Sequence, residues 1–549
     1  MMEKILSPIV RAFHIYVIEF HMGICYTYLR VKKHHIKGAT IMKNKLFAML
    51  LAAILLSGTV ACSKSDPGTT EDNSGTTDTT TSDTTDADTE TSADTEEEDF
   101  VANLPKADYG GREFRLESAN SLAGITSATT INIAEELTGE VVNDALYNRD
   151  RYLEQQYNIV MQNTINETRD ATVLQKLVLS GDTGLEVSFG DIASYGGYLM
   201  LNGLVYPMNF VENVQLDKPY WNQAANEAMT IGESVYFPTG AVSPRFYGSV
   251  YIIMFNKDLA EDMGIENLYD AVHDGTWTID KMFNLAQGAL VDLNGDGKYN
   301  TDDQYGMVYE VLTANALWVG AGKNVIKTVN GELQYTIENE DIVNLFERIL
   351  KYYADPSVTR DQGSAEISAL LNEGRTLFQN PCTFTLTEYR EVDYDFGILP
   401  MPKEDENQAE YISYGQPWVT YSPYVPITIT GADREMVGMV LDGMAAYGHE
   451  YVRPAVFDNV IQLKSTRDEE SAKIVHDIFD NVSFELVSTV SSDEIGYASN
   501  VRRLFDDLFT NKFGSMELAS SWASVKDAAE KDLKSLVATL AENEAKMQQ

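Results

Sequence analysis

Strand-like and helix-like segments alternate over residues 112–192, and this alternation constrains the fold more than any other feature of the chain. The strand-like segments are 112–119, 159–165 and 187–192, and the helix-like segments between them are 139–158 and 170–182. Strands separated by helices at this spacing pair in parallel as βαβ units. The sequence therefore predicts an α/β fold.

The end of the third strand carries candidate ligand-binding residues. In open α/β sheets, ligands bind beyond the carboxyl ends of the strands. Asp191 closes this strand, and Ser194 and Tyr195 follow it. We expect these three side chains to lie at a ligand site.

The second half of the chain is rich in predicted helices. An apolar strand running into a helix is expected over 248–265, and Thr278 or Asp280 can cap the helix that follows Trp277. Long helices are expected over roughly the last 120 residues. A continuous domain of about 450 residues with a strand crossing near residue 250 predicts two lobes that share more than one connection.

The sequence from Met42 reads as a targeting segment. Basic residues are followed by an apolar stretch over 46–56 that is too short to span a bilayer, and small residues precede Cys62. Residues 42–61 resemble the signal peptide of a bacterial lipoprotein, although Thr59 stands where leucine is commoner. The resemblance implies cleavage before Cys62, a diacylglycerol on its sulfur, and anchoring on the extracellular face of the cell membrane. A plain secretory signal is the alternative.

Residues 1–41 precede this complete signal. They hold four of the seven histidines and a cluster of basic residues. We expect translation to start at Met42, which makes 1–41 a start-site extension. A short membrane segment at 15–20 is the alternative, and Glu19 interrupts it.

Residues 62–104 are expected to form a lipidated cysteine and a disordered tether. From 63 to 99 the sequence has no aromatic or large aliphatic residue and is nearly all Thr, Ser, Asp and Glu. Such a segment cannot bury enough apolar surface to offset the entropy lost on ordering, and its like charges extend it. The folded domain is therefore predicted to span 105–549.

The folded part is strongly acidic. The chain has a formal net charge of −42, and residues 100–549 contain 68 acidic residues against 32 basic ones. Repulsion from phosphates argues against nucleic acid and anionic lipid surfaces as partners. Cys382 is the one cysteine in this part, so no disulfide can form within it. We expect a monomer that binds neutral or cationic small molecules.

Several motifs, in a fixed order, resemble the extracellular solute-binding proteins of ABC importers, the family that includes maltose-type and oligosaccharide binders. The motifs are "VSFGDIASYGGYLMLNGLVYPMN", with Met208 where the family has leucine, an aromatic-Asn-Lys-Asp-Leu motif at 255–259, "GTWTIDKM", and "DFGILPMPKEDENQAEYIS". The resemblance covers roughly 105–549.

The resemblance implies a two-lobed, periplasmic-binding-protein-like fold (type II) with a hinge and an α-rich C-terminal part. The first lobe is expected at about 105–250 with a segment near 398–450, and the second lobe in the remainder. A small solute, a sugar or oligosaccharide by family, is then held in an interlobe cleft, because only the closed state contacts it from both sides. The closed protein docks on an ABC permease, and no catalysis is expected.

Residues 292–303, "DLNGDGKYNTDD", resemble the calcium loop of an EF-hand. Its ligand positions hold Asp292, Asn294, Asp296, the Lys298 carbonyl, Asn300 and Asp303, and Gly297 stands at the turn. Asp303 replaces the usual glutamate, and this shorter carboxylate reaches the ion less easily with both oxygens. We expect a structural Ca²⁺ here, apart from the solute site, with a solvated turn as the alternative.

Aromatic residues are the candidates for contact with a sugar, because the flat C–H faces of sugars stack on aromatic rings. Trp318 and Trp418 are expected in glycine-flanked loops that form a cleft wall, with ordinary burial as the alternative. Trp277 and Trp522 are expected in the core. Further ligand candidates near the crossings are Arg245, Tyr247, Glu388 and Tyr389.

Enzyme signatures are sparse. Three histidines, His273, His449 and His476, fall in the folded part, in no metal-binding spacing, and no nucleophile elbow or phosphate loop occurs. A surface glycoside hydrolase would need two convergent carboxylates, and the pair Glu469–Glu470 is expected on a solvated helix face. A calcium-dependent adhesion or scaffold protein would need repeated loops, and the chain has one. These two functions are the alternatives to a solute receptor.

Replacing Cys62 with Ala tests the lipid anchor. Without the sulfur no diacylglycerol can be attached, so we expect the domain to appear in the medium or to keep an uncleaved signal. Fractionation of cells and medium measures this. A variant that is processed and retained on the membrane like the wild type would contradict the lipoprotein prediction.

Overall fold

The computed structural model describes residues 99–119, 132–166, 168, 170–309, 313–360, 365–461, 469–490, 499–508 and 517–548. The predicted signal, Cys62 and the tether up to residue 98 lie outside these ranges. Asp99–Gln549 forms one unit of the chain. Among the described residues, no helix combines the length and the apolar character needed to cross a membrane.

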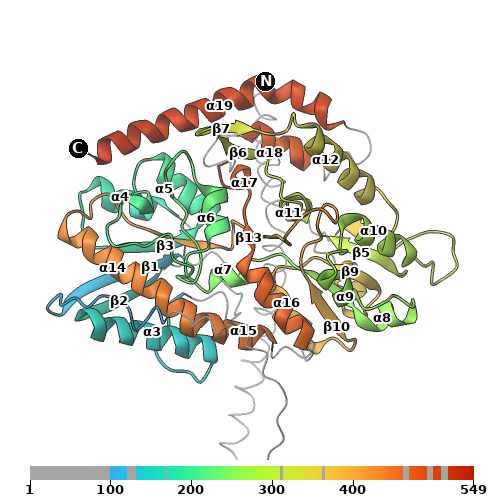
Figure 1. Ribbon diagram of the computed structural model, residues 1–549, viewed down its shortest axis with the longest axis horizontal. Helices are drawn as coiled ribbons and strands as arrows, with labels where there is room; N and C mark the ends of the chain where they lie inside the picture. The colour runs from blue at the N-terminus through green and yellow to red at the C-terminus, as the bar shows by residue number, and fades with distance from the viewer. Residues whose placement is uncertain are drawn as a thin grey trace, which may run out of the picture. The chain divides into compact units, whose positions relative to one another are not determined.

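A four-stranded mixed sheet forms the centre of the first lobe (Figure 1), in the order β12-β3-β1-β2. Its strands are β1 (Arg112–Ala119), β2 (Ile159–Asn166), β3 (Val187–Asp191) and β12 (Tyr421–Tyr424). β1 pairs in parallel with β2 and β3, so the predicted βαβ units are confirmed. β12 returns from much later in the chain and pairs antiparallel with β3.

Two helices of the first lobe, α3 (Val141–Tyr157) and α4 (Thr172–Leu179), lie where the sequence predicts them. The others are α5 (Gly197–Leu201), α6 (Gln223–Met229), α7 (Arg245–Gly248), α14 (Ala432–Tyr447) and α15 (Arg453–Ile461), with the short turns η2 (Ile192–Gly196), η3 (Met208–Phe210) and η5 (Gly448–Val452). α3 starts where the Glu140 side chain accepts the Asn143 N–H, and it buries Val142, Leu146 and Leu153. Its amphipathic face therefore packs on the sheet as the sequence indicates.

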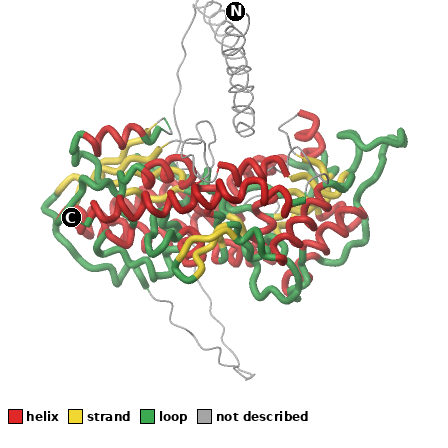
Figure 2. Tube along the Cα trace, turned by 90° about the horizontal axis from the view of Figure 1, so that it is seen from above, coloured by secondary structure: helices red, strands yellow, loops and turns green. Residues whose placement is uncertain are grey.

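A five-stranded mixed sheet forms the centre of the second lobe, in the order β10-β4-β9-β5-β8. Its strands are β4 (Ile253–Asn256), β5 (Tyr305–Tyr309), β8 (Val358–Arg360), β9 (Thr376–Gln379) and β10 (Phe396–Leu399). The two sheets lie apart within the unit (Figures 1 and 2). The predicted two-lobed α/β fold is therefore confirmed.

The second lobe also contains helices and a hairpin. They are α8 (Lys257–Asp262), α9 (Leu268–His273), α10 (Ile279–Gly288), α11 (Thr313–Gly320), β6 (Ile326–Val329), β7 (Glu332–Tyr335), α12 (Glu340–Tyr353), α13 (Ala365–Asn372) and η4 (Thr383–Glu391). Of the two candidate caps for α10, Thr278 is the one whose side chain accepts the Lys281 N–H. The preceding Trp277 is fully buried, as expected.

The C-terminal part is α-rich, as predicted, and it ends in a helix that contacts both lobes. Its elements are α16 (Glu469–Asp480), β13 (Val482–Ser483), α17 (Leu486–Val490), α18 (Ser499–Asp506) and α19 (Leu518–Met547). Near its start, the Trp522 ring of α19 lies 5.1 Å from that of Tyr335 on β7. Near its end, Glu544 accepts a hydrogen bond from the first-lobe Tyr236 hydroxyl at 2.8 Å. α19 therefore runs from one lobe to the other (Figure 1).

Backbone hydrogen bonds join four short segments into a ribbon between the lobes, which we call the hinge ribbon. Its segments are 249–252, 381–383, β11 (Ser413–Tyr414) with the two residues after it, and 481–483. Tyr251 N donates to Tyr414 O at 2.8 Å, and Gly415 N donates to Ser483 O at 2.9 Å. The rings of Tyr251 and Tyr414 stack at 5.7 Å. The lobes thus share several connections, as predicted.

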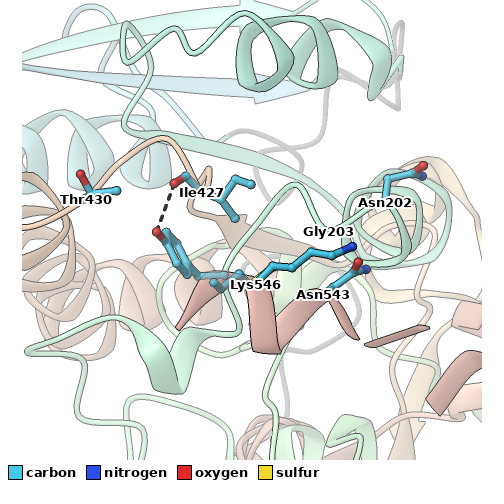
Figure 3. Close-up of a pocket in the computed structure, with 8 residues that line it drawn as sticks. Asn202, Gly203, Ile427, Thr430, Asn543 and Lys546 are labelled. Carbon is cyan, nitrogen blue, oxygen red and sulfur yellow. Dashed lines mark hydrogen bonds between the residues drawn. The ribbon is translucent and has the colours of Figure 1, made fainter. Parts of the chain in front are cut away.

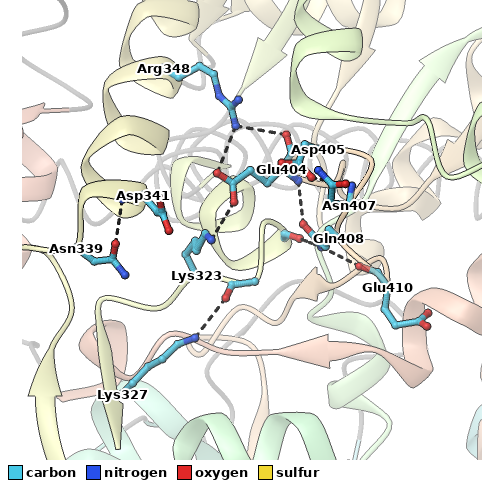
Figure 4. Close-up of polar contacts among 12 residues, drawn as sticks. Lys323, Lys327, Asn339, Asp341, Arg348, Glu404, Asp405, Asn407, Gln408 and Glu410 are labelled. Atoms are coloured by element: carbon cyan, nitrogen blue, oxygen red, sulfur yellow. Dashed lines mark hydrogen bonds and ion pairs between the residues drawn. The ribbon is translucent and has the colours of Figure 1, made fainter. Parts of the chain in front are cut away.

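The connection from β10 to the hinge ribbon stays on the second lobe for about ten residues (Figure 4). Glu404 pairs with Lys323 at 3.0 Å and with Arg348 at 3.7 Å. Gln408 Nε2 donates to the Gly320 carbonyl at 2.7 Å. These contacts hold the loop against α11 and α12.

The second segment of the first lobe, which was expected near 398–450, starts later than residue 398. β10 pairs with β4 in the second-lobe sheet, so the chain returns to the first lobe only at β12. It also extends past residue 450, because α15 packs against α3. The sequence located the crossing only approximately, since pairing between distant strands decides it.

Glu485 is a buried carboxyl group just beyond the hinge ribbon. Its side chain is 0% exposed and accepts the Val325 N–H at 2.7 Å and the Val487 N–H at 3.2 Å. Burial in this low-dielectric site raises the pKa of Glu485 to about 7. The folded state therefore binds this proton more tightly than the unfolded state does.

Stability should depend on pH through Glu485. Because its folded pKa lies above the unfolded value, the free energy of unfolding should fall as pH rises from about 4.5 to about 7. Glu485→Gln carries no titratable group, so whatever its absolute stability, that stability relative to wild type should rise over the window by about 3 kcal/mol. Urea unfolding of both proteins at pH 5 and pH 8 measures this. Parallel pH profiles would contradict the assignment.

Candidate functional site

Asp191 shapes the carboxyl end of β3. It accepts the Ser194 N–H at 2.8 Å, the Ser194 hydroxyl at 3.1 Å and the Tyr195 N–H at 3.4 Å. This capping turns the chain from β3 into η2. The Tyr195 hydroxyl is bonded to Ser188 at 2.7 Å, and burial raises the pKa of Tyr195, so its phenol stays protonated at neutral pH.

Arg245 lies at the same edge of the first sheet. Its guanidinium is 3.9 Å from the centroid of the Tyr421 ring, and the side chain is 4% exposed. Tyr421 pairs with Asp191 in the ladder between β12 and β3. The structure thus brings Arg245 and Asp191 together around Tyr421, which sequence reasoning did not single out.

Trp418 lies in the turn that leads into β12. The Pro417 carbonyl accepts the Ala193 N–H at 3.3 Å, and the Thr420 hydroxyl donates to the Ser249 hydroxyl at 2.6 Å. The turn is therefore held against both η2 and the hinge ribbon. All five tryptophans lie in described residues, and Trp418 is half-buried whereas the other four are buried. The role of Trp418 as a cleft wall stays a prediction.

The second lobe approaches this edge through η4, which contacts α7. Glu388 on η4 is exposed, and Tyr389 is half-buried with its ring 6.0 Å from that of Phe396. Tyr247 on α7 is buried against Phe479 at 5.3 Å, and burial raises its pKa. Glu388 and Tyr389 thus lie on η4, which contacts the helix that carries Tyr247. Tyr247 itself packs in a core against Phe457 and Phe479.

Trp318 does not lie in the loop that we expected. It belongs to α11, is 0% exposed, and packs at 4.5 Å from Phe346 and 5.1 Å from Phe505. The neighbouring Gly320 reflects close packing, because a Cβ there would meet Met401 at 2.9 Å. The placement favours the core alternative for Trp318. Trp522 is also buried, as expected.

A cavity of about 360 Å³ lies away from these residues, between the first lobe and the end of α19 (Figure 3). The Tyr206 hydroxyl at its wall donates to the Ile427 carbonyl at 3.1 Å. The lining residues are Asn202, Gly203, Tyr206, Ile427, Thr430, Asn543, Lys546 and Met547. None of the expected ligand residues lines this cavity.

Backbone N–H groups of the 292–303 loop donate hydrogen bonds to the carboxylates of the same loop. Asp292 accepts the N–H groups of Gly295 at 2.7 Å and Gly297 at 2.9 Å, and the buried Asp303 accepts those of Leu293 and Asn300. Within the described residues, no three His, Cys, Asp or Glu side chains gather as a metal cluster. Each carboxylate oxygen has a second lone pair available to an ion. Calcium binding therefore stays a prediction.

The acidic pair on α16 has surface partners. Glu470 is bonded to His273 at 2.8 Å and to Lys473 at 3.0 Å, and Glu469 is exposed. Both lie at the start of α16, which packs against β10 of the second lobe. These two carboxylates are on a solvated face, as expected.

Comparisons with known proteins return similar solved structures. No family model and no curated protein match the chain. An ABC substrate-binding protein from Listeria monocytogenes in complex with cycloalternan is 13% identical, with 77% of this chain and 99% of that chain covered and a TM-score of 0.47. The galacto-N-biose/lacto-N-biose I-binding protein of an ABC transporter from Bifidobacterium longum is 12% identical, with 78% and 98% covered and a TM-score of 0.49.

A maltose/maltodextrin-binding domain from Bdellovibrio bacteriovorus bound to maltotriose is 15% identical, with 77% and 100% covered and a TM-score of 0.44. These proteins are of the class that the sequence motifs of this chain resemble.

Calcium should stabilise the fold if the 292–303 loop binds it. An ion bound only by the folded state adds RT ln(1 + [Ca²⁺]/Kd), about 2.7 kcal/mol at a hundredfold excess over Kd. We expect a chelator to lower Tm by a few degrees, and the double variant Asp292→Ala, Asp296→Ala to lose that shift. A Tm that is indifferent to calcium and chelator would favour the solvated turn.

Proposed function

We propose that this chain is a surface-anchored receptor that captures a small neutral sugar or oligosaccharide between its two lobes and delivers it to an ABC permease. The observation that carries the proposal is the grouping of Asp191, Ser194, Arg245 and Trp418 where the hinge ribbon joins the lobes. We call this group, together with Tyr421, the carboxyl-edge cluster.

The chemistry of the carboxyl-edge cluster suits a sugar. Trp418 offers an incompletely buried indole for stacking against a pyranose face. Ser194 and Arg245 offer polar groups that can orient hydroxyls. The acidic chain repels anionic solutes, so a neutral carbohydrate is the solute class that we expect.

The hinge ribbon suggests how capture works. Its backbone bonds join the lobes through short segments, so the lobes can rotate about it while each keeps its core. A solute that contacts both η4 and the carboxyl-edge cluster stabilises the closed arrangement by its extra contacts in that state. The permease would then distinguish the closed receptor from the open one.

The remaining parts of the proposal follow from the sequence. Lipidation at Cys62 and the acidic tether would hold a monomeric receptor on the outer face of the membrane. Capture and release need no bond to be made or broken, so the receptor would not be an enzyme. The glycoside hydrolase alternative would release products, and this separates the two.

Titration with neutral sugars tests the proposal. Tryptophan fluorescence of the full domain is followed against maltose, lactose, cellobiose and their trisaccharides, and each mixture is analysed for products. We expect at least one sugar to change the fluorescence saturably and to remain intact. Hydrolysis would support the glycosidase alternative, and no response to any sugar would contradict the proposal.

Trp418→Ala should weaken binding of that sugar by about 1–3 kcal/mol, because it removes a large stacking surface. Tm of the sugar-free protein should change little. The matched control is Trp318→Ala, which should cost about 3–5 kcal/mol of folding stability and leave the sugar affinity of the folded fraction unchanged. The reverse pattern would show that Trp418 is core and Trp318 is the wall.

A further inference from the structure

Asn132 is a buried asparagine that no sequence motif marks. It lies between β1 and α3 and is 5% exposed. Its backbone carbonyl accepts a hydrogen bond from Arg149 Nη2 at 3.3 Å. Its side-chain Oδ1 accepts one from the Ser243 hydroxyl at 2.5 Å. The residue is therefore held from two sides of the first lobe.

The hydrogen-bond partners of Ser243 orient the Asn132 amide, because the oxygen and nitrogen of an amide are assigned from their partners. The Ser243 hydroxyl accepts the Arg245 N–H and donates its own proton to Asn132 Oδ1. Oδ1 therefore faces Ser243, and Nδ2 faces away from it.

The Nδ2 group of Asn132 has no hydrogen-bond partner anywhere in the described part of the chain. A buried donor without a partner destabilises the folded state, and most buried polar side chains avoid this condition. A bound molecule that supplies an acceptor would remove this cost. Asn132 therefore has a buried donor that a ligand oxygen could satisfy, and its neighbours decide whether it lies at the proposed site.

Hydrogen bonds connect Asn132 to the carboxyl-edge cluster. The Ser243 hydroxyl that donates to Asn132 also accepts the Arg245 N–H at 3.3 Å. Arg245 in turn lies over Tyr421, the strand partner of Asp191. Asn132 is therefore two hydrogen bonds away from the arginine of the proposed sugar site.

A buried ion pair supports the backbone of Asn132. Arg149 Nε donates to Asp150 at 2.9 Å, and both side chains are 1% exposed. The other oxygen of Asp150 accepts from Asn163 Nδ2 at 2.6 Å. This buried pair holds the Asn132 backbone in place, so the direction of its amide is set before any ligand binds.

We propose that Asn132 is a specificity-determining residue whose Nδ2 donates a hydrogen bond to a hydroxyl or ring oxygen of the bound sugar. This rests on the proposed function and adds a partner that the sequence did not suggest. A site built to donate to a particular oxygen discriminates strongly against an analogue that lacks it. Asn132 would thus select among neutral sugars by the position of one oxygen.

The test uses the full domain and the tightest-binding sugar among maltose, lactose, cellobiose and their trisaccharides. Asn132→Ala should raise its Kd at least tenfold. Asn132→Asp keeps the acceptor for Ser243 but replaces the donor by a carboxylate oxygen, so it should weaken binding in the same way. It serves as the second variant if Asn132→Ala does not fold.

Asn226 provides a matched control. It is also a buried asparagine of the first lobe, 7% exposed, with Nδ2 unpartnered among the described residues, but its Oδ1 accepts from the Thr239 backbone. Asn226→Ala should lower Tm about as much as Asn132→Ala does and change the sugar Kd less than twofold. Equal losses of affinity in both variants would indicate a general structural effect and overturn the proposal.

Singly deoxygenated versions of the same sugar identify the oxygen. One of them should bind wild type at least tenfold more weakly than the parent sugar but bind Asn132→Ala as well as the parent does, because the lost interaction is shared. If wild type and Asn132→Ala bind the parent sugar equally, water alone satisfies Nδ2, and the proposal fails while the receptor function stands. If no sugar binds wild type, both fail.

Discussion

Hydrogen bonds between the backbones of four short segments hold the two lobes of this protein together, and the position of the candidate site follows from them. Tyr251 and Tyr414 pair their backbones and stack their rings, and Gly415 continues the pairing to Ser483. A Cβ at Gly415 would meet the Phe484 ring at 2.3 Å, so glycine lets these segments approach. Each lobe has its own sheet, and the hinge ribbon fixes which edges of the two sheets face each other.

Buried polar groups brace the first lobe around this arrangement. Asp442 on α14 accepts hydrogen bonds from the Gln215 backbone, the Tyr220 hydroxyl and the Trp221 indole. Beside Asn132, Asp150 accepts hydrogen bonds from Arg149 and Asn163. Because these donors satisfy the buried carboxylates, the cost of removing them from water is lowered and the surrounding segments are ordered. α19, which contacts both lobes, has to move with one of them or bend during any closure.

The local sequence pattern predicted the helices and strands well, whereas packing between residues far apart in the sequence determines which side chains lie at the candidate site. The strands at 112–119 and 159–165, the Thr278 cap and the terminal helix follow from spacing and capping rules that act over a few residues. Glycines after Trp318 suggested a wall position, yet Gly320 serves close packing of a helix and Gly322 adopts the left-handed backbone conformation just after that helix. No local sequence pattern marks Asn132, because its side-chain partner Ser243 lies 111 positions away in the sequence.

Small-angle scattering from the isolated domain, with and without a bound neutral sugar, measures whether the lobes close on a solute. If the lobes close about the hinge ribbon on a sugar held at the carboxyl-edge cluster, saturation should lower the radius of gyration, because closure brings the two lobes nearer to each other. Trp418→Ala should require more sugar for the same change. A radius of gyration that stays constant while fluorescence reports saturation would contradict capture by lobe closure.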